Sequence, residues 1–139
     1  MATFRAEKRV RTEGEGDMVD LTAWVRERVG ASDLKEGIAC VFASHSTATM
    51  VLIEDETGLR QDLKNSMERL FPKGIEYEHN SAWGDGNGHS HIRATSLGQS
   101  VTFPFSDGAP DLGTWQQVVL VELDNLGRDR HVVLQLVGD

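Results

Sequence analysis

Three of the five histidines in this 139-residue chain, His79, His89 and His91, surround a glycine-rich segment at residues 84–88. A fourth, His45, follows an apolar run and lies between two serines. Neutral imidazole is the commonest protein ligand for transition metals. The histidines therefore predict a divalent metal site.

The spacing of His89 and His91 suggests how two of these ligands share one ion. In an extended segment, residues two positions apart point to the same side of the backbone. His45 and His79 then have to come from other elements of the fold. A catalytic zinc site uses three protein ligands and leaves one position for water or substrate. The alternative is that these are solvent-exposed histidines in a polar loop.

Three acidic or amide side chains are candidates for catalysis. Glu54 ends an apolar run, where it serves either as a general base or metal ligand, or as part of a solvated helix start. Asp85 and Asn87 alternate with glycines. Their segment either brings backbone N–H groups and a carboxylate close to a ligand, or it forms an ordinary turn.

Other side chains are candidates for binding a phosphorylated ligand. Ser46 and Thr47 follow His45, and their hydroxyls either fix its tautomer or contact a phosphate. A nucleophilic serine is disfavoured because the chain has no G-x-S-x-G elbow. Trp115 and Gln116 precede an apolar run and either line a pocket or play a structural part. Arg130, like its neighbour Arg128, either binds an anion or forms a surface ion pair.

Length and charge narrow the class of protein. A chain of 15.4 kDa is most simply one domain over residues 1–139. Its net charge of -8 argues against nucleic-acid binding and leaves small molecules, metals or other proteins as partners. The single cysteine, Cys40, excludes an intrachain disulfide, and no apolar stretch is long enough for a membrane span. We expect a cytoplasmic protein.

The apolar patterning predicts an α+β domain with a mostly antiparallel sheet and two to three helices. Helices are expected at residues 18–29, capped by Asp17, and at residues 57–70. The segment from Lys73 to His91 has no regular pattern and is expected to be a long functional loop. Strands are predicted for six further segments, residues 4–10, 37–44, 48–53, 101–105, 115–123 and 131–137.

Several of these pieces occur in an order that resembles the YjbQ family, small bacterial and archaeal proteins named for a secondary thiamine-phosphate synthase activity. The pieces are His-Ser-Thr-Ala at 45–48, Glu54, Asp-Gly-Asn at 85–87, His-Ile-Arg-Ala at 91–94, and Leu-Gly-Thr-Trp-Gln at 112–116. The last is the most telling. The resemblance extends over residues 4–138, essentially the whole chain.

This resemblance implies a compact α+β fold, a homotrimer and a three-histidine metal centre. The family's histidines fall on His45, His79 and His91, whereas His89 has no counterpart and is at most an auxiliary ligand. Glu54, Asp85 and Asn87 match further polar positions of the family. Arg130 matches a basic position before the last strand.

The implied activity joins hydroxymethylpyrimidine diphosphate to thiazole phosphate with loss of pyrophosphate. Diphosphate chemistry usually employs Mg²⁺ on oxygen ligands, whereas a histidine site suits Zn²⁺ better, with Mn²⁺ a further candidate. That mismatch favours a secondary role for the named activity. The alternatives are a metal-dependent hydrolase of a small substrate and a non-catalytic metal- or ligand-binding module.

Overall fold

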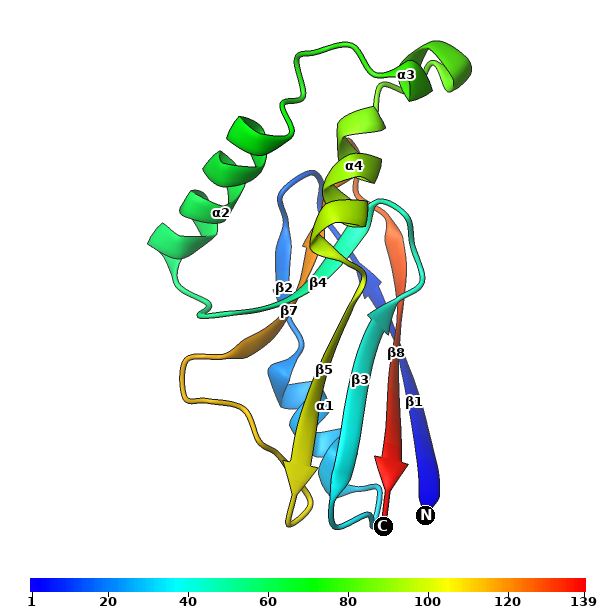
Figure 1. The fold of residues 1–139 in the computed structure, drawn as a ribbon, viewed down its shortest axis with the longest axis vertical. Helices are drawn as coiled ribbons and strands as arrows, with labels where there is room; N and C mark the ends of the chain where they lie inside the picture. Colours follow the sequence, from blue (N-terminus) through cyan, green and yellow to red (C-terminus); the bar gives the residue numbers. More distant parts are fainter.

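Two antiparallel sheets and four helices make up residues 1–139 in a computed structural model of the chain (Figure 1). The larger sheet has the strand order β1 (Ala2–Arg11), β8 (Asp129–Gly138), β3 (Gly37–Ala43), β5 (Ser100–Ser106), β6 (Ala109–Pro110). The smaller sheet has the order β2 (Met18–Asp20), β7 (Gln117–Glu122), β4 (Ala48–Ile53). The helices are α1 (Thr22–Gly30), α2 (Thr57–Leu70), α3 (Glu78–Trp83) and α4 (Gly88–Leu97).

The main core lies between the two sheets. Strand β3 shows why, because Ala39 and Val41 are fully buried while Ile38 and Phe42 on its other face are exposed. This alternation turns one face of the five-stranded sheet toward the smaller sheet and α1. The opposite face of the five-stranded sheet has no helix over it (Figure 1).

The three-stranded sheet is covered on both faces. Val118 and Leu120 of β7 face the main core, while Val119 and Val121 belong to a second cluster with Met67 of α2. Ala94 of α4 packs in the same second cluster. A strand that is buried on both sides needs a continuous apolar run, which β7 has. This packing against β7 fixes the positions of α2 and α4.

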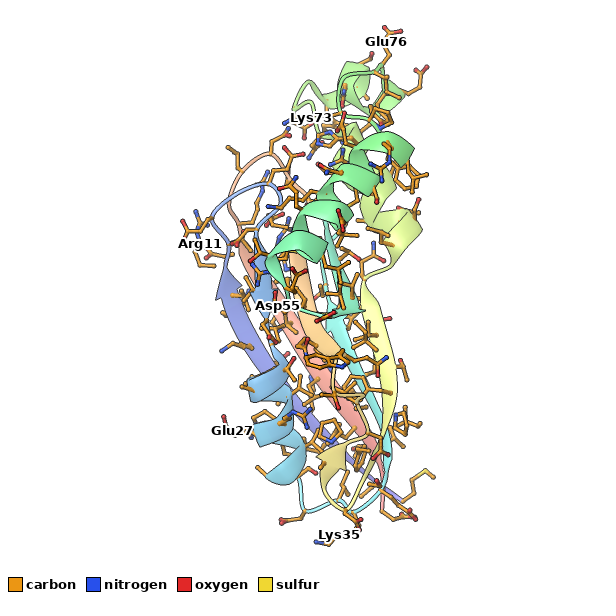
Figure 2. All side chains as sticks on the ribbon, turned by 90° about the vertical axis from the view of Figure 1, so that its left-hand side faces the viewer. Arg11, Glu27, Lys35, Asp55, Lys73 and Glu76 are labelled. Carbon is orange, nitrogen blue, oxygen red and sulfur yellow. The ribbon has the colours of Figure 1, made fainter.

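The expected antiparallel α+β fold is confirmed, with four helices instead of two to three. The predicted strands and the helix at 57–70 occur at the expected places, and Glu56 caps α2 by accepting hydrogen bonds from Gly58 and Leu59. The side view in Figure 2 places α1 and α2 over opposite halves of the molecule, with Asp55 between them. None of the four helices is long and apolar enough to cross a membrane.

Two predicted segments were wrong. The helix expected from residue 18 begins at Thr22, because residues 18–20 form β2 and pair with β7. Asp17 does not cap it; its carboxylate accepts a hydrogen bond from Glu13 N–H instead. The segment from Lys73 to His91 is not one long loop, since it contains α3 and the start of α4.

Candidate functional site

A cavity of about 410 Å³ opens at the end of the sandwich where β3 ends and β8 begins. These strand ends meet because β3 and β8 are antiparallel neighbours, with Ala43 opposite Val132. The start of α4 and the β7–β8 turn close the other sides. The lining contains no hydrophobic residue and consists of Ser44, His45, Ser46, Thr47, Asn87, His91, Asp124, Arg128, Asp129 and Arg130. We call this cavity the polar pocket.

Arg130 is held rigidly at the base of the polar pocket. Its guanidinium forms a bidentate ion pair with the fully buried carboxylate of Glu122, through Nε and Nη2. Nη2 also donates to the carbonyl and the hydroxyl of Thr47, at 3.1 and 2.9 Å. Nη1 makes no hydrogen bond within the protein. Because Nε and Nη2 are committed to Glu122 and Thr47, Nη1 is the one guanidinium nitrogen that can still donate to an anion.

Asp124 organises the neighbouring side chains. Its carboxylate accepts hydrogen bonds from Thr47 Oγ1 at 3.1 Å, Asn87 Nδ2 at 3.3 Å and Arg128 Nε at 3.2 Å. Burial raises the pKa of Asp124, but the hydrogen bonds, led by the backbone N–H of Asn125, outweigh it and hold the pKa below its ordinary range. Asp124 is therefore an ionised structural anchor.

His45 is partly buried and points its Nε2 at the backbone. That nitrogen accepts a hydrogen bond from the N–H of His131 at 2.7 Å. Because a neutral imidazole has only one ring lone pair, Nδ1 carries the proton. Burial, and next the charge of Arg130, hold the pKa of His45 below its ordinary value. The side chain is a neutral hydrogen-bond donor.

His91 and His79 form an imidazole pair at the edge of the polar pocket. Their ring centroids are 4.4 Å apart, with the planes tilted by 58°. Burial lowers the pKa of His91, and the neighbouring His79 lowers it further. The Nε2 atom of His79 is buried and has no hydrogen-bond partner, because the nearest carboxylate oxygen, on Asp85, is 3.8 Å away.

The predicted three-histidine metal centre fits this arrangement only in part. No group of three His, Cys, Asp or Glu side chains is placed to hold one metal ion. His45 has committed its only lone pair to the backbone of residue 131. His79 and His91 lie together and offer two imidazoles, and the unpartnered Nε2 of His79 is the kind of atom that a ligand satisfies. The residues do not make up the full predicted set.

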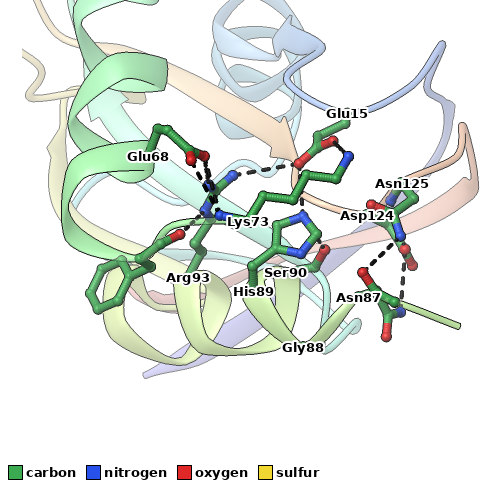
Figure 3. A network of polar contacts seen from close by, with 12 residues as sticks. Glu15, Glu68, Lys73, Asn87, Gly88, His89, Ser90, Arg93, Asp124 and Asn125 are labelled. Atoms are coloured by element: carbon green, nitrogen blue, oxygen red, sulfur yellow. Dashed lines mark hydrogen bonds and ion pairs between the residues drawn. The ribbon is translucent and has the colours of Figure 1, made fainter. Parts of the chain in front are cut away.

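His89 faces away from the polar pocket. Both His89 and His91 lie on helix α4, where residues two apart point in widely different directions, so the prediction of a same-side pair was wrong. His89 is fully buried, and its Nε2 lies 2.8 Å from the carboxylate of Glu15. Figure 3 shows this contact as a dashed line. The same carboxylate accepts a hydrogen bond from Lys73. His89 thus ties α4 to the β1–β2 connection.

Arg93 extends this network to α2. Its guanidinium is almost fully buried, donates to Glu68 at 2.8 Å and to the carbonyl of Phe71 at 3.0 Å, and lies 3.5 Å from Glu15 (Figure 3). Buried charges of this kind are stable only when paired. The network therefore fixes α4, which carries His91 and begins directly after Asn87.

Three predicted site residues lie elsewhere. Glu54 follows β4 and is exposed, seven positions along the chain from Thr47 and therefore about 20 Å away at about 3.3 Å per residue. Trp115 and Gln116 precede β7 and are also exposed. Since Ile53 pairs with Gln117, all three lie at the opposite end of the small sheet from the polar pocket.

The other predicted residues lie in or beside the polar pocket. Ser46, Thr47, Asn87 and Arg130 line it. Asp85 does not; its side chain is half exposed in the turn after α3, and Asn125 fixes that turn by donating to the carbonyls of Asp85 and Gly86. The turn reading of this segment agrees with the left-handed backbone of Gly86, at φ 64°.

Two residues that shape the polar pocket were missed from the sequence. Glu122 is the last residue of β7, and Asp124 lies in the turn that follows. Their partners, Arg130 and Thr47, come from other parts of the chain. The only sequence signal was a pair of carboxylates at the end of an apolar run that is otherwise free of charge. Buried charge at such a position implies a partner.

The family profile described as UPF0047 protein YjbQ-like matches residues 6–139. A UPF0047 protein of Methanothermobacter thermautotrophicus is 35% identical over 138 residues, covering 99% of this chain and 94% of that relative. A UPF0047 protein of Mycobacterium tuberculosis is 40% identical over 121 residues, covering 86% of this chain and 91% of the relative.

Solved structures agree with this grouping. The crystal structure of a YbjQ-like protein of unknown function from Sulfolobus solfataricus superposes with a TM-score of 0.93 at 34% identity, covering 99% of both chains. A hypothetical protein from Aeropyrum pernix gives a TM-score of 0.87 at 31% identity, with both chains fully covered. Profile, sequences and structures agree over nearly the whole length, and the chain belongs to the YjbQ-like UPF0047 family.

Proposed function

We propose that the polar pocket binds the phosphoryl group of a small substrate and that the protein is a transferase. The observation that carries this proposal is a lining without a single hydrophobic residue. The lining of the polar pocket contributes hydrogen-bond donors from Arg128, from Nη1 of Arg130 and from the ring N–H of His45. Preorganised donors of this kind stabilise the negative charge that develops on a phosphoryl leaving group.

The reaction that the family resemblance implies is the synthesis of thiamine phosphate. The bond between the pyrimidine methylene carbon and the diphosphate oxygen breaks, and its electron pair leaves with pyrophosphate. The lone pair of the thiazole nitrogen forms the new bond to that carbon. In this proposal Arg128 and Arg130 bind the departing diphosphate, while Asn87 and Asp124 keep the pocket in shape.

A divalent metal ion is a separate part of the proposal, with Zn²⁺ preferred over Mg²⁺ or Mn²⁺. His79 and His91 support it as two ligands, and a site with open positions favours the second candidate function, a metal-dependent hydrolase of a small substrate. Elemental analysis of the purified protein tests it. Stoichiometric metal that a His79→Ala, His91→Ala double variant loses supports the site, and absence of metal after incubation with Zn²⁺ or Mn²⁺ contradicts it.

The transferase is tested by incubating the protein with the two heterocyclic substrates and measuring thiamine phosphate and pyrophosphate together. Arg128→Ala is the informative variant, because this side chain is half exposed and its loss leaves the core intact. Loss of a charged hydrogen bond predicts a fall in kcat/KM of about tenfold to a hundredfold. Arg26→Ala, an exposed position on α1, is the charge-matched control.

Calorimetric measurement of inorganic phosphate binding separates the two parts of the proposal, the phosphoryl-binding site and the transferase reaction. Phosphate that binds to the parent and not to Arg128→Ala supports the phosphoryl site, even without product. A parent that neither binds phosphate nor forms product contradicts the proposal as a whole.

A further inference from the structure

A serine, a histidine and a glutamate form a hydrogen-bonded chain at the edge of the polar pocket, on the uncovered face of the five-stranded sheet. Ser44 directly follows β3, His131 belongs to β8 and Glu7 belongs to β1. The Ser44 hydroxyl lies 3.2 Å from Nδ1 of His131. Nε2 of His131 lies 3.1 Å from a carboxylate oxygen of Glu7. We call these three residues the Ser44 triad.

The register of the sheet brings the Ser44 triad together. Because β3 and β8 are antiparallel neighbours, Ser44 and His131 oppose each other, and the N–H of Ser44 donates to the carbonyl of His131 at 3.2 Å. Glu7 is opposite Val133, two residues along β8 from His131, and side chains two apart share one face of a sheet. The triad therefore arises from strand pairing, without the G-x-S-x-G elbow whose absence disfavoured a nucleophilic serine.

The hydrogen bonds set the protonation that a nucleophilic serine requires. Glu7 is ionised, because a hydrogen bond from Arg5 at 3.0 Å is the main cause that lowers its pKa from the ordinary value. A carboxylate only accepts, so in the neutral imidazole of His131 the proton is on Nε2 and is donated to Glu7. The lone pair of Nδ1 then faces the Ser44 hydroxyl, whose other acceptor, the carbonyl of His131, is farther away at 3.4 Å. A histidine in this arrangement can act as a general base.

Ser44 is the member of the triad that opens into the polar pocket. The side chains of His131 and Glu7 lie behind it on the sheet face, where they are 26% and 50% exposed. A molecule in the pocket therefore meets the hydroxyl of Ser44. The same lining contains two hydrogen-bond donors, the ring N–H of His45 and Nη1 of Arg130, that can stabilise negative charge on a carbonyl oxygen.

We infer that Ser44 is a nucleophile and that the protein hydrolyses small, polar carboxylic esters through an acyl-enzyme. This activity does not depend on phosphoryl binding. The substrate class follows from the pocket, because a cavity of about 410 Å³ without a hydrophobic residue in its lining suits a short acyl group and offers no wall for a fatty one.

The reaction has two halves. Oγ of Ser44 forms a bond to the ester carbonyl carbon while its proton passes to Nδ1 of His131, and the bond from that carbon to the alcohol oxygen then breaks, so that the alcohol leaves with the proton. Water next attacks the acyl group and gives a proton to Nδ1. The carboxylic acid leaves as this proton returns to Oγ. Glu7 keeps its hydrogen bond to Nε2 throughout and is a positioning residue.

The first test is labelling of the intact protein with a fluorophosphonate, located by mass spectrometry of its peptides. Oγ of Ser44 displaces fluoride from phosphorus, and its proton passes to His131. We expect stoichiometric label on Ser44 and none on Ser44→Ala. His131→Gln should slow labelling by about a hundredfold, because the general base is lost. Ser100→Ala is the control, since Ser100 is exposed, opposite Phe42 on the same sheet, and its hydroxyl bonds to no histidine; it should be labelled like the parent.

The second test measures hydrolysis of p-nitrophenyl acetate and p-nitrophenyl octanoate. We expect the acetate to give a burst of nitrophenolate, which marks the acyl-enzyme, and Ser44→Ala to lose that burst. The octanoate should have a kcat/KM at least about tenfold lower, because its chain finds no apolar surface in the pocket.

Glu7→Ala separates a positioning role from a purely structural one. It should lower kcat for the acetate by about threefold to tenfold and leave KM unchanged, since a half-exposed carboxylate is screened by water. Added formate should restore part of the rate, because its carboxylate can accept the hydrogen bond from Nε2 of His131. Glu36→Ala, at an exposed position before β3, should change neither kcat nor the response to formate.

The outcomes decide this inference separately from the proposed function. A parent that takes up no label, or label that persists in Ser44→Ala, overturns the nucleophile. Faster hydrolysis of the octanoate than of the acetate overturns the substrate class. Binding of inorganic phosphate, measured on the same protein, decides the phosphoryl site whichever way these tests fall. Circular dichroism of each variant confirms that the fold is retained.

Discussion

Asp124 and Glu122 give the polar pocket its shape without being left free to bind a ligand. Each carboxylate is almost fully buried and is surrounded by hydrogen-bond donors. The groups that remain for a ligand are on their partners, notably Arg128 and Nη1 of Arg130. At the scale of single residues, the site is a set of donors held by buried anions.

Removing Glu122 alone should therefore lower the free energy of unfolding by more than removing both members of the ion pair. Glu122→Leu leaves the buried guanidinium of Arg130 without a counter-ion, which lowers the free energy of unfolding by about 3–5 kcal/mol. The double variant Glu122→Leu, Arg130→Met removes both charges and should recover part of that loss. Urea denaturation measures both, and equal losses in the single and double variants would show that the unpaired charge is not the cause.

The pH dependence of stability should reveal His45. Its folded-state pKa lies below the ordinary value, so folding favours the neutral ring. The stability contributed by the neutral form is complete above the ordinary pKa of about 6.5 and is lost as the pH falls toward the folded pKa. The free energy of unfolding should decrease from pH 7 to pH 5.

His45→Gln is the matched variant, because an amide oxygen can accept from the N–H of residue 131 without titrating. It should flatten the decrease with pH. His91 also has a lowered pKa, so the decrease is not abolished. A variant with the same slope as the parent would rule out His45 as a source of the pH dependence.

Helix α3 depends on its contact with α4. Gly88→Ala places a methyl group 2.4 Å from Tyr77 Cβ, so α3 must move or the helices must separate. Overpacking of this kind costs about 1–3 kcal/mol. Hydrogen exchange should accelerate in residues 77–88. Gly74→Ala is the control because no atom lies within 4 Å of its added methyl group, and equal acceleration there would contradict the steric explanation.

Periodic elements were predictable, whereas α4 was not. Helix α2 and strands β3 and β4 carry apolar residues at the spacing of their type. The buried side of α4 instead consists of His89, Ser90, Arg93 and Ala94 with Gly88. Glu15 pairs with Nε2 of His89, and Glu68 pairs with Arg93. Such a helix has no hydrophobic period, and its partners lie far away in the sequence.

The same limit applies to the site. His45, Thr47, Asn87, His91 and Arg130 were found because their residue types bind ligands or because the family shares them. Asp124 became recognisable only when the fold brought it to a threonine 77 positions away. Glu54, Trp115 and Gln116 match the family motif, but that match does not bring them to this pocket.

At the scale of the whole molecule, we propose that the uncovered face of the five-stranded sheet joins the subunits of a homotrimer. Ile38, Phe42 and Val137 are 49%, 42% and 40% exposed there. Exposed apolar surface of this kind favours association. Light scattering should give three times the 15.4 kDa chain mass, and Phe42→Asp should lower it. A parent that elutes at the chain mass would contradict the trimer.

The position of β8 between β1 and β3 has a consequence for how fast the domain folds. Ala2 pairs with Gly138, and the same glycine pairs with Gly37, so the sheet joins the two ends of the sequence. Pairings between such distant residues must overcome the entropy of closing long loops before any contact stabilises them. Refolding should therefore take milliseconds to seconds, whereas helix α2, whose contacts are local, can form within about a microsecond.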